Sequence, residues 1–265
     1  MEIVFHQVGY KDKLNNIDLE ISNDSIVGII GKNSSYVISM INTDIQPILG
    51  TVTINGIESN IENKKKLSKQ IAYIRKNSVL AFKNDIVLAE IGTVVDEKEY
   101  KNSNINKRIK DAFAMVGLNE SYLTRRFDTM SNSELYLIQI AIQIICNPKI
   151  FIFENPFLNL DYNNKKRLIK LIKLLKEKYH KMIFICDDNV DVLYQYTDKI
   201  IFAKDCNKVV MYDTYDFFTS VKFLKANNIE LPNLVDITYM GKLKGAKLTY
   251  QKDIRDIIKD IYKHV

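Results

Sequence analysis

The stretch FDTMSNSELYLIQIAIQIICNPKIFIFENPFLNLD, residues 127–161, carries the pattern that decides the fold. Within it, residues 133–147 (SELYLIQIAIQIICN) are apolar over most of a helical surface, which predicts a buried helix. The run KIFIF at 149–153 is continuously apolar, as is typical of a strand that is covered on both faces. A buried helix followed at once by such a strand indicates an α/β protein.

The same alternation of strand and helix patterns continues on both sides of this stretch. Downstream, the sequence predicts a helix at 163–180, a buried strand at 182–186, a short helix, and a strand at 198–203. This order indicates right-handed crossovers and a parallel sheet. Upstream, strands are predicted at 2–8, 15–21, 25–30, 50–56 and 70–75, and helices at about 36–45 and at 64–70.

The predicted organisation is one large α/β domain with a C-terminal piece, which suits a chain of 265 residues. Residues 1–220 form the domain, and the mostly helical residues from about 84 to 145 form an insertion within it. Residues 221–265 form a separate extension, for which dimerisation is one candidate role.

Composition and charge are those of an ordinary globular protein. Hydrophobic residues make up 46% of the chain and charged residues 26%, and the formal net charge is +6. This mild basicity permits a patch that faces nucleic acid or an anionic surface. However, the lysine clusters at 64–66 and 165–167 lie in predicted helices and are interpreted as solvated helix faces. The charge therefore gives no strong nucleic-acid signal.

Cysteine usage and hydropathy argue against several classes of protein. Cys146, Cys186 and Cys206 form no C-x-x-C pair, which disfavours a zinc site or a disulfide framework and suits a reducing cytoplasm. The N-terminal MEIVFHQVGY is a strand pattern rather than a signal peptide. No run approaches the roughly 20 apolar residues that span a bilayer. Work at a membrane would therefore require another chain as the anchor.

The order of these segments resembles the ATP-binding subunit of an ABC transporter along the whole chain. Residues 127–161 are similar, nearly position for position, to the signature motif, the helix after it, an Asn-Pro-Lys turn, the Walker B strand and the D-loop. The tail at 227–245 (NNIELPNLVDITYMGKLKG) looks like the C-terminal segment of the energy-coupling-factor (ECF) branch, which drives vitamin and metal-ion uptake. The resemblance implies a P-loop NTPase-like ABC nucleotide-binding domain. Such a domain has a mixed sheet core with N-terminal antiparallel strands, a helical insertion and, in this branch, a small α-rich C-terminal extension.

The phosphate-binding loop implied by the resemblance is altered. A Walker A loop reads G-x-x-x-x-G-K-[ST], and its glycines, lysine and hydroxyl hold the phosphates and Mg²⁺. Tyr36 stands at the second glycine, Val37 at the lysine and Ile38 at the hydroxyl. Ser39 comes one position late, which on a helix turns it about 100° away. The whole remnant consists of Gly31, Lys32, Asn33, Ser34, Ser35, Tyr36, Val37, Ile38 and Ser39.

Two readings of this loop stay open. It can be a plain strand–turn–helix corner without a ligand, in which Tyr36 fills the former nucleotide pocket. Alternatively, backbone N–H groups at the helix N-terminus can still attract an anion.

Three further positions that the resemblance assigns to the nucleotide are also changed. Lys76 falls at the Q-loop glutamine, where a cation cannot ligate a metal but can meet an anion or acidic groups of a partner. Asp187 falls at the switch histidine and would repel a γ-phosphate. Tyr10 is the candidate for stacking on adenine, although an ordinary strand tyrosine explains it as well.

The signature and Walker B motifs have lost most of their polar groups. Ser131, Asn132, Ser133 and Glu134 stand in the signature, and the Ser-x-x-Glu spacing predicts a helix capping box. The Walker B strand ends in Glu154-Asn155 instead of Asp-Glu, so no general base is left there. Asp161 of the D-loop is retained, which fits a surviving dimer interface or a simple helix N-cap.

These losses predict a catalytically degenerate ABC subunit with no catalytic residue and little or no ATP hydrolysis. No cofactor is expected, and weak binding of ATP and Mg²⁺ is left open. The predicted partners are a paralogous ABC ATPase and a transmembrane coupling subunit, with a homodimer as an alternative. The chain would then lie on the cytoplasmic face of the membrane, held there only by its partner.

Two other functions are not excluded by the sequence. The chain can be a soluble binding module that reuses the fold for another ligand, protein or nucleic acid. It can also be an active ATPase with a relocated site.

Overall fold

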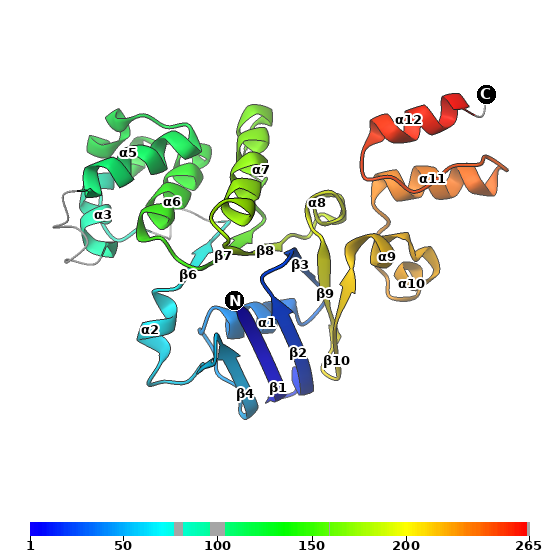
Figure 1. The fold of residues 1–265 in the computed structure, drawn as a ribbon, viewed down its shortest axis with the longest axis horizontal. Coiled ribbons are helices and arrows are strands. Elements are labelled where there is room, and N and C mark those ends of the chain that lie inside the picture. Colours follow the sequence, from blue (N-terminus) through cyan, green and yellow to red (C-terminus); the bar gives the residue numbers. More distant parts are fainter. Residues whose placement is uncertain (77–81, 96–103, 159, 264–265) are drawn as a thin grey trace. The chain divides into compact units, whose positions relative to one another are not determined.

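The computed structural model divides into two compact units, residues 57–186 with Met1, and residues 2–56 with 187–265 (Figure 1). The structure describes residues 1–76, 82–95, 104–158 and 160–263.

The unit of residues 57–186 is built on a parallel sheet. Strands β6 (Ile71–Ile74), β7 (Ile150–Glu154) and β8 (Met182–Cys186) pair side by side in parallel, with Ile71 opposite Ile150 and Ile150 opposite Met182. Nearly every residue of β7 and β8 is buried, as their continuous apolar pattern predicts. Because the strands are parallel, the residues that follow β6 and end β7 meet at one edge of the sheet.

Helices make up most of the rest of this unit. Helix α6 (Asn132–Cys146) buries nine of its fifteen residues, which confirms the buried helix predicted from its apolar pattern. Helix α5 (Ile105–Val116) ends at Gly117, whose φ of +80° suits a glycine cap. The remaining elements are β5 (Ile57–Glu58), α2 (Lys64–Ser68), α3 (Val87–Val94), α7 (Tyr162–Glu177) and short 3-10 turns at Glu120–Thr124 and Phe127–Thr129.

The unit of residues 2–56 and 187–265 contains two groups of strands. Strand β1 (Glu2–Tyr10) pairs antiparallel with both β2 (Leu14–Ser22) and β4 (Leu49–Ile54). Strand β3 (Ile26–Ile30) runs parallel to β9 (Lys199–Asp205). The N-terminal antiparallel strands and the mixed α/β fold implied by the resemblance are thus confirmed.

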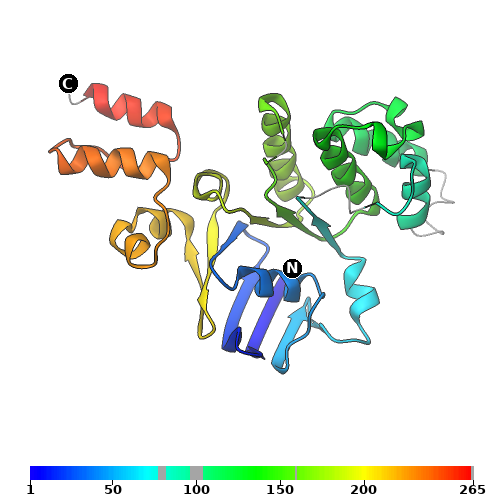
Figure 2. The same ribbon diagram turned by 180° about the vertical axis from the view of Figure 1, so that it is seen from behind.

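The helices of this unit cluster toward the end of the chain, where α11 (Asn233–Leu243) and α12 (Ile254–Lys263) lie side by side (Figures 1 and 2). The extension is therefore helical, as predicted. The other helices are α1 (Ser34–Ile41), α8 (Val190–Tyr196), α9 (Thr214–Thr219) and α10 (Val221–Ala226).

Two local predictions were wrong. The first helix was expected at about 36–45 but spans Ser34–Ile41, because Thr43 adopts a left-handed φ of +61° that stops the helix. Strand β10 (Lys208–Asp213), which pairs antiparallel with β9, was not predicted. Its partly exposed residues do not give a clear alternation of apolar and polar side chains.

The domain boundaries predicted at residue 220 and around the helical insertion stay predictions, and part of that insertion lies outside the described residues. Within the described ranges, no helix is both long and apolar enough to cross a bilayer.

Candidate functional site

The phosphate-loop remnant forms a tight corner between β3 and α1. Gly31 has a φ of +116°, which favours glycine. A Cβ on Gly31 would lie 2.4 Å from the carbonyl oxygen of Ala203 on β9, which is too close for any side chain. Asn33 is buried; its backbone N–H donates to the Ala203 oxygen at 3.1 Å, and its side-chain amide donates to the Lys13 carbonyl at 2.7 Å. The chain's own groups therefore hold the corner.

Backbone donors at the start of α1 are bonded within the loop itself. The N–H of Ser34 donates to the Gly31 carbonyl at 3.1 Å. The N–H groups of Tyr36 and Val37 both donate to the Asn33 carbonyl, at 3.1 and 3.4 Å. Donors that are satisfied in this way are not directed toward an outside anion. The loop thus has the hydrogen bonding of an ordinary helix start.

The side chains of the loop add no phosphate-binding group at the lysine position. Val37 is 0% exposed and Ile38 is 8% exposed, so both belong to the hydrophobic core. Of the remaining side chains, Lys32 and Ser35 are exposed, and Ser34, Tyr36 and Ser39 are half-buried.

The structure brings Tyr36 and Tyr10 together. Their ring centroids lie 5.9 Å apart with an angle of 41° between the planes, which is a normal aromatic contact. Both tyrosines are half-buried. The candidate adenine-stacking residue therefore already has an aromatic neighbour, supplied by the position at which the resemblance places a glycine.

Lys76 and Glu154 also meet, at the carboxyl ends of β6 and β7. The backbone N–H of Lys76 donates to Oε2 of Glu154 at 3.3 Å, and the Lys76 ammonium lies 3.9 Å from Oε1. The positions that the resemblance assigns to the Q-loop and to Walker B are thus adjacent, and an ammonium faces the carboxylate there. Within the described residues, no cluster of three His, Cys, Asp or Glu side chains is placed to bind a metal ion.

Asn155, which follows Glu154, is fixed by its backbone. Its N–H donates to the Cys186 carbonyl at 2.7 Å, and its φ is +43°. Asparagine tolerates this left-handed conformation better than most residues. Its amide side chain cannot take a proton from water at neutral pH, so the position offers no general base.

The signature remnant is organised around the carboxylate of Glu134. The N–H and hydroxyl of Ser131 donate to Oε2 of Glu134 at 2.8 and 2.9 Å, and the Ser131 hydroxyl oxygen accepts from the Glu134 N–H at 3.3 Å. Oε1 accepts from the Tyr122 hydroxyl at 2.6 Å and from the Arg125 guanidinium at 3.1 Å. This confirms the predicted capping box and adds two donors that sequence reasoning missed. We call these four residues the Glu134 cluster.

The Glu134 cluster should make stability depend on pH in the acid range. The hydrogen bond from Tyr122, and then those from Ser131, lower the pKa of Glu134 from 4.5 to about 2. A lowered carboxyl pKa stabilises the fold above the unfolded value, and this contribution is lost as the pH falls from about 4.5 toward 2. We expect Glu134→Gln to unfold more easily than wild type at pH 7, by about 1–2 kcal/mol.

Thermal unfolding followed by circular dichroism between pH 2 and 7 measures this difference. The difference in stability between wild type and Glu134→Gln should disappear as the pH approaches 2. Glu120→Gln is the matched control, because Glu120 forms an exposed pair with Lys110 at 3.1 Å and should change stability by less than about 0.5 kcal/mol. A pH-independent gap would contradict the assigned role of the carboxylate.

The other predicted site residues have local structural partners. Asp161 caps α7 by accepting from the N–H of Asn164 at 2.8 Å. This is the helix N-cap that was one of its two predicted roles. Asp187 accepts from the N–H of Asn189 at 2.9 Å, and burial raises the pKa of its carboxyl group. Ser133 has a buried hydroxyl without a partner among the described residues. Of the D-loop, Asn159 lies outside the described residues.

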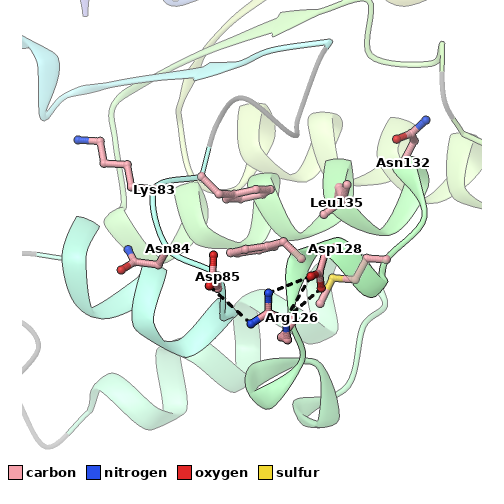
Figure 3. Close-up of a pocket in the computed structure, with 10 residues that line it drawn as sticks. Lys83, Asn84, Asp85, Arg126, Asp128, Asn132 and Leu135 are labelled. Atoms are coloured by element: carbon pink, nitrogen blue, oxygen red, sulfur yellow. Dashed lines mark hydrogen bonds and ion pairs between the residues drawn. The ribbon is translucent and has the colours of Figure 1, made fainter.

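A surface pocket beside the signature remnant was not predicted. It has a volume of about 390 Å³ and is lined by charged, polar and apolar side chains, and Asn132 of the signature is one of the polar ones (Figure 3). The rings of Phe82 and Phe127 stack with centroids 3.9 Å apart. Arg126 forms ion pairs with Asp128 at 2.9 Å and with Asp85 at 3.5 Å. The segments FKND and RRFD supply these residues, but only the fold shows that they meet.

These elements define a class of protein: a cassette with a glycine-cornered loop before α1, a Ser-capped α6, and a buried strand that ends at Glu154. The chain belongs to the ABC transporter family, since residues 14–158, more than half of its length, match that family. The Mycoplasma mobile protein named energy-coupling factor transporter ATP-binding protein EcfA2 is 25% identical to it, with 91% of this chain and 85% of that relative covered. This confirms the resemblance to the ECF branch.

Solved structures agree on the fold. The structure of cbiO1 from Clostridium perfringens, described as part of the ABC transporter complex cbiONQ, has a TM-score of 0.71 at 18% identity. The match covers 89% of this chain and 98% of the cbiO1 chain. A dimeric ATP-binding cassette bound to ADP and phosphate has a TM-score of 0.64 at 19% identity. The match covers 80% of this chain and 98% of that cassette.

Proposed function

We propose that this chain is a degenerate ABC-type subunit that works as a structural or regulatory partner of an active ATPase and a transmembrane coupling protein. The observation that carries the proposal is the contact between Lys76 and Glu154. At the strand ends where the resemblance puts the metal, the chain places its own cation against its own carboxylate, 3.9 Å apart. A lysine ammonium cannot ligate Mg²⁺, and its charge opposes a second cation there.

Two other observations support the loss of nucleotide chemistry. The side chain of Val37 lies in the core, so no cation reaches the phosphates from that position. The Ser131 hydroxyl, which the resemblance makes the candidate phosphate donor of the signature, is bonded to the Glu134 carboxylate at 2.9 Å. A second anion at this place would meet like-charge repulsion. The residues present therefore do not fit Mg·ATP, and no hydrolytic step is assigned to them.

The pocket in Figure 3 supports docking onto a membrane partner. Its stacked Phe82 and Phe127 offer an apolar surface, and Arg126, Asp85 and Asp128 offer polar contacts at the rim. This combination suits a short helix or loop of another protein. The proposed complex places the chain at the inner face of the membrane through its partner, in uptake of a vitamin or metal ion.

The C-terminal helices support contact with a second ATPase-like chain. Several large apolar side chains of α11 and α12 are well exposed, which is unusual for a surface without a partner. They are Ile237, Met240, Leu243, Ile254, Ile258, Ile261 and Tyr262. We assign this face to a paralogous subunit, with a second copy of the chain as the alternative.

Purification of the tagged chain from its native source tests this proposal. We expect a homologous ATPase and a protein with several membrane spans to co-purify, and Phe127→Glu to release the membrane protein. ATP turnover of the assembly should be unchanged when Asn155→Ala is introduced into this chain, because Asn155 provides no base.

Two outcomes would contradict the proposal. Turnover of the chain alone that Asn155→Ala abolishes would establish an active, relocated site. A chain that purifies only as a monomer or homodimer, without any membrane protein, would favour a soluble binding module.

A further inference from the structure

A second cavity lies at the other edge of the parallel sheet, away from the Lys76–Glu154 pair. It has a volume of about 310 Å³ and is bounded by α5, α6, α7 and the starts of β7 and β8. Its floor is apolar and includes Met115 of α5 and Leu175 of α7. A concave apolar site of this size with a few polar groups is typical of small-molecule binding sites. We call it the α5–α7 cavity.

The polar group that marks this cavity is the ammonium of Lys181, just before β8. The side chain is half-buried, and burial together with the charge of nearby Lys149 lowers its pKa. Its partner is a neutral amide: Nζ donates to Oδ1 of Asn147 at 2.7 Å. Among the described residues, no carboxylate forms an ion pair with it. A half-buried cation without a counter-ion is electrostatically unsatisfied and favours an anion.

The groups around Lys181 are held in place by the fold. Asn147 ends α6 in a left-handed conformation, with a φ of +53°, and this aims its amide at Lys181. The guanidinium of Arg108 lines the same cavity and donates to the Ile145 carbonyl. Asp111 is the one acidic residue among those that line it, and it forms no ion pair with Lys181 among the described residues.

We propose that the α5–α7 cavity binds a small amphiphilic anion. The anionic head, a carboxylate, sulfonate or phosphate, is placed at Lys181, and a hydrocarbon or aromatic body lies against the apolar floor. The cavity is separate from the Lys76–Glu154 pair, because Asn147 and Lys181 precede β7 and β8, whereas that pair lies at the carboxyl ends of β6 and β7. A ligand bound here would contact α5 and α7, and its binding would not require ATP.

The absence of tryptophan from the chain allows a direct test. Tyr179 lines the cavity and is 44% exposed, so Tyr179→Trp places one fluorescent reporter at its mouth. The probe is 8-anilinonaphthalene-1-sulfonate, an aromatic sulfonate that accepts energy from tryptophan. We expect saturable energy transfer from this reporter. Tyr262→Trp, on the exposed face of α12, is the control for probe bound at the C-terminal helices.

Removal of the cation tests the chemistry of recognition. On the Tyr179→Trp background, Lys181→Met should weaken binding of the sulfonate about tenfold, the usual effect of losing one charged hydrogen bond. Lys173→Met, an exposed lysine on α7, should leave it unchanged within twofold. The uncharged analogue N-phenyl-1-naphthylamine should be insensitive to Lys181→Met.

Each alternative result is decisive. If the sulfonate bound equally well with and without Lys181→Met on the Tyr179→Trp background, the cavity would be a non-specific apolar groove and the proposal would be wrong. Saturable transfer only from the Tyr262→Trp reporter would place the probe elsewhere and overturn it as well. Because neither result involves ATP or a partner protein, both can be told apart from failure of the proposed transporter role.

Discussion

Titration of the purified chain with Mg·ATP should show no saturable binding below about 1 mM. Each charged hydrogen bond to a phosphate contributes about 1.5–3 kcal/mol, and loss of the lysine and the magnesium-binding hydroxyl removes at least two such interactions. Two lost interactions weaken binding by about 3 kcal/mol or more, which is at least a hundredfold. Neither of the two altered positions supplies a free cation in their place, because Val37 is in the core and the Lys76 ammonium is opposite Glu154.

A repaired loop is the positive control for this result. The triple variant Tyr36→Gly, Val37→Lys and Ile38→Ser restores the Walker A pattern and frees one face of Tyr10. It should bind Mg·ATP at least tenfold more tightly than wild type in isothermal calorimetry. Lys32→Met tests whether the exposed lysine earlier in the loop has taken over the role of the missing phosphate-binding lysine. This substitution should leave the affinity for Mg·ATP unchanged. Micromolar affinity in the wild-type chain would contradict the degenerate reading.

Local patterns in the sequence were sufficient to predict much of the fold. The apolar surface of α6 and the continuous apolar run of β7 depend only on burial, which composition and spacing reveal. The Ser131-x-x-Glu134 capping box depends on short-range backbone chemistry. Each of these features is set by neighbouring residues, and each was found.

The missed features join residues that are distant in the sequence. Nothing in the local pattern of Tyr122 or Arg125 indicates a bond to Glu134, because the 3-10 turn that aims them is set by tertiary packing. The stack of Phe82 on Phe127 likewise appears only when the two segments meet. The contact between Lys76 and Glu154 was not predicted either, because the resemblance assigned the two residues to separate motifs and the ion pair depends on the two strand ends meeting.

Replacement of Gly31 by alanine should be among the most damaging single changes in the phosphate-loop remnant. A non-glycine residue at a φ of +116° costs roughly 1–3 kcal/mol in backbone strain. The new Cβ would also lie 2.4 Å from the Ala203 carbonyl oxygen, so the loop must move away from β9. That movement breaks the hydrogen bond from the Asn33 N–H to the same oxygen. We expect a total loss of about 3 kcal/mol or more, measured by chemical unfolding.

Gly56→Ala separates the steric clash from the cost of a positive φ. Gly56 has a φ of +72° in the same unit, but a Cβ there would meet nothing within 4 Å. Its substitution should therefore cost only about 1 kcal/mol, the usual penalty for alanine in a left-handed conformation. If Gly31→Ala were no more damaging than Gly56→Ala, the loop would not be seated against Ala203. The loss expected for Gly31→Ala follows from the packing of β3, α1 and β9, which needs a glycine at this position whether or not a nucleotide binds.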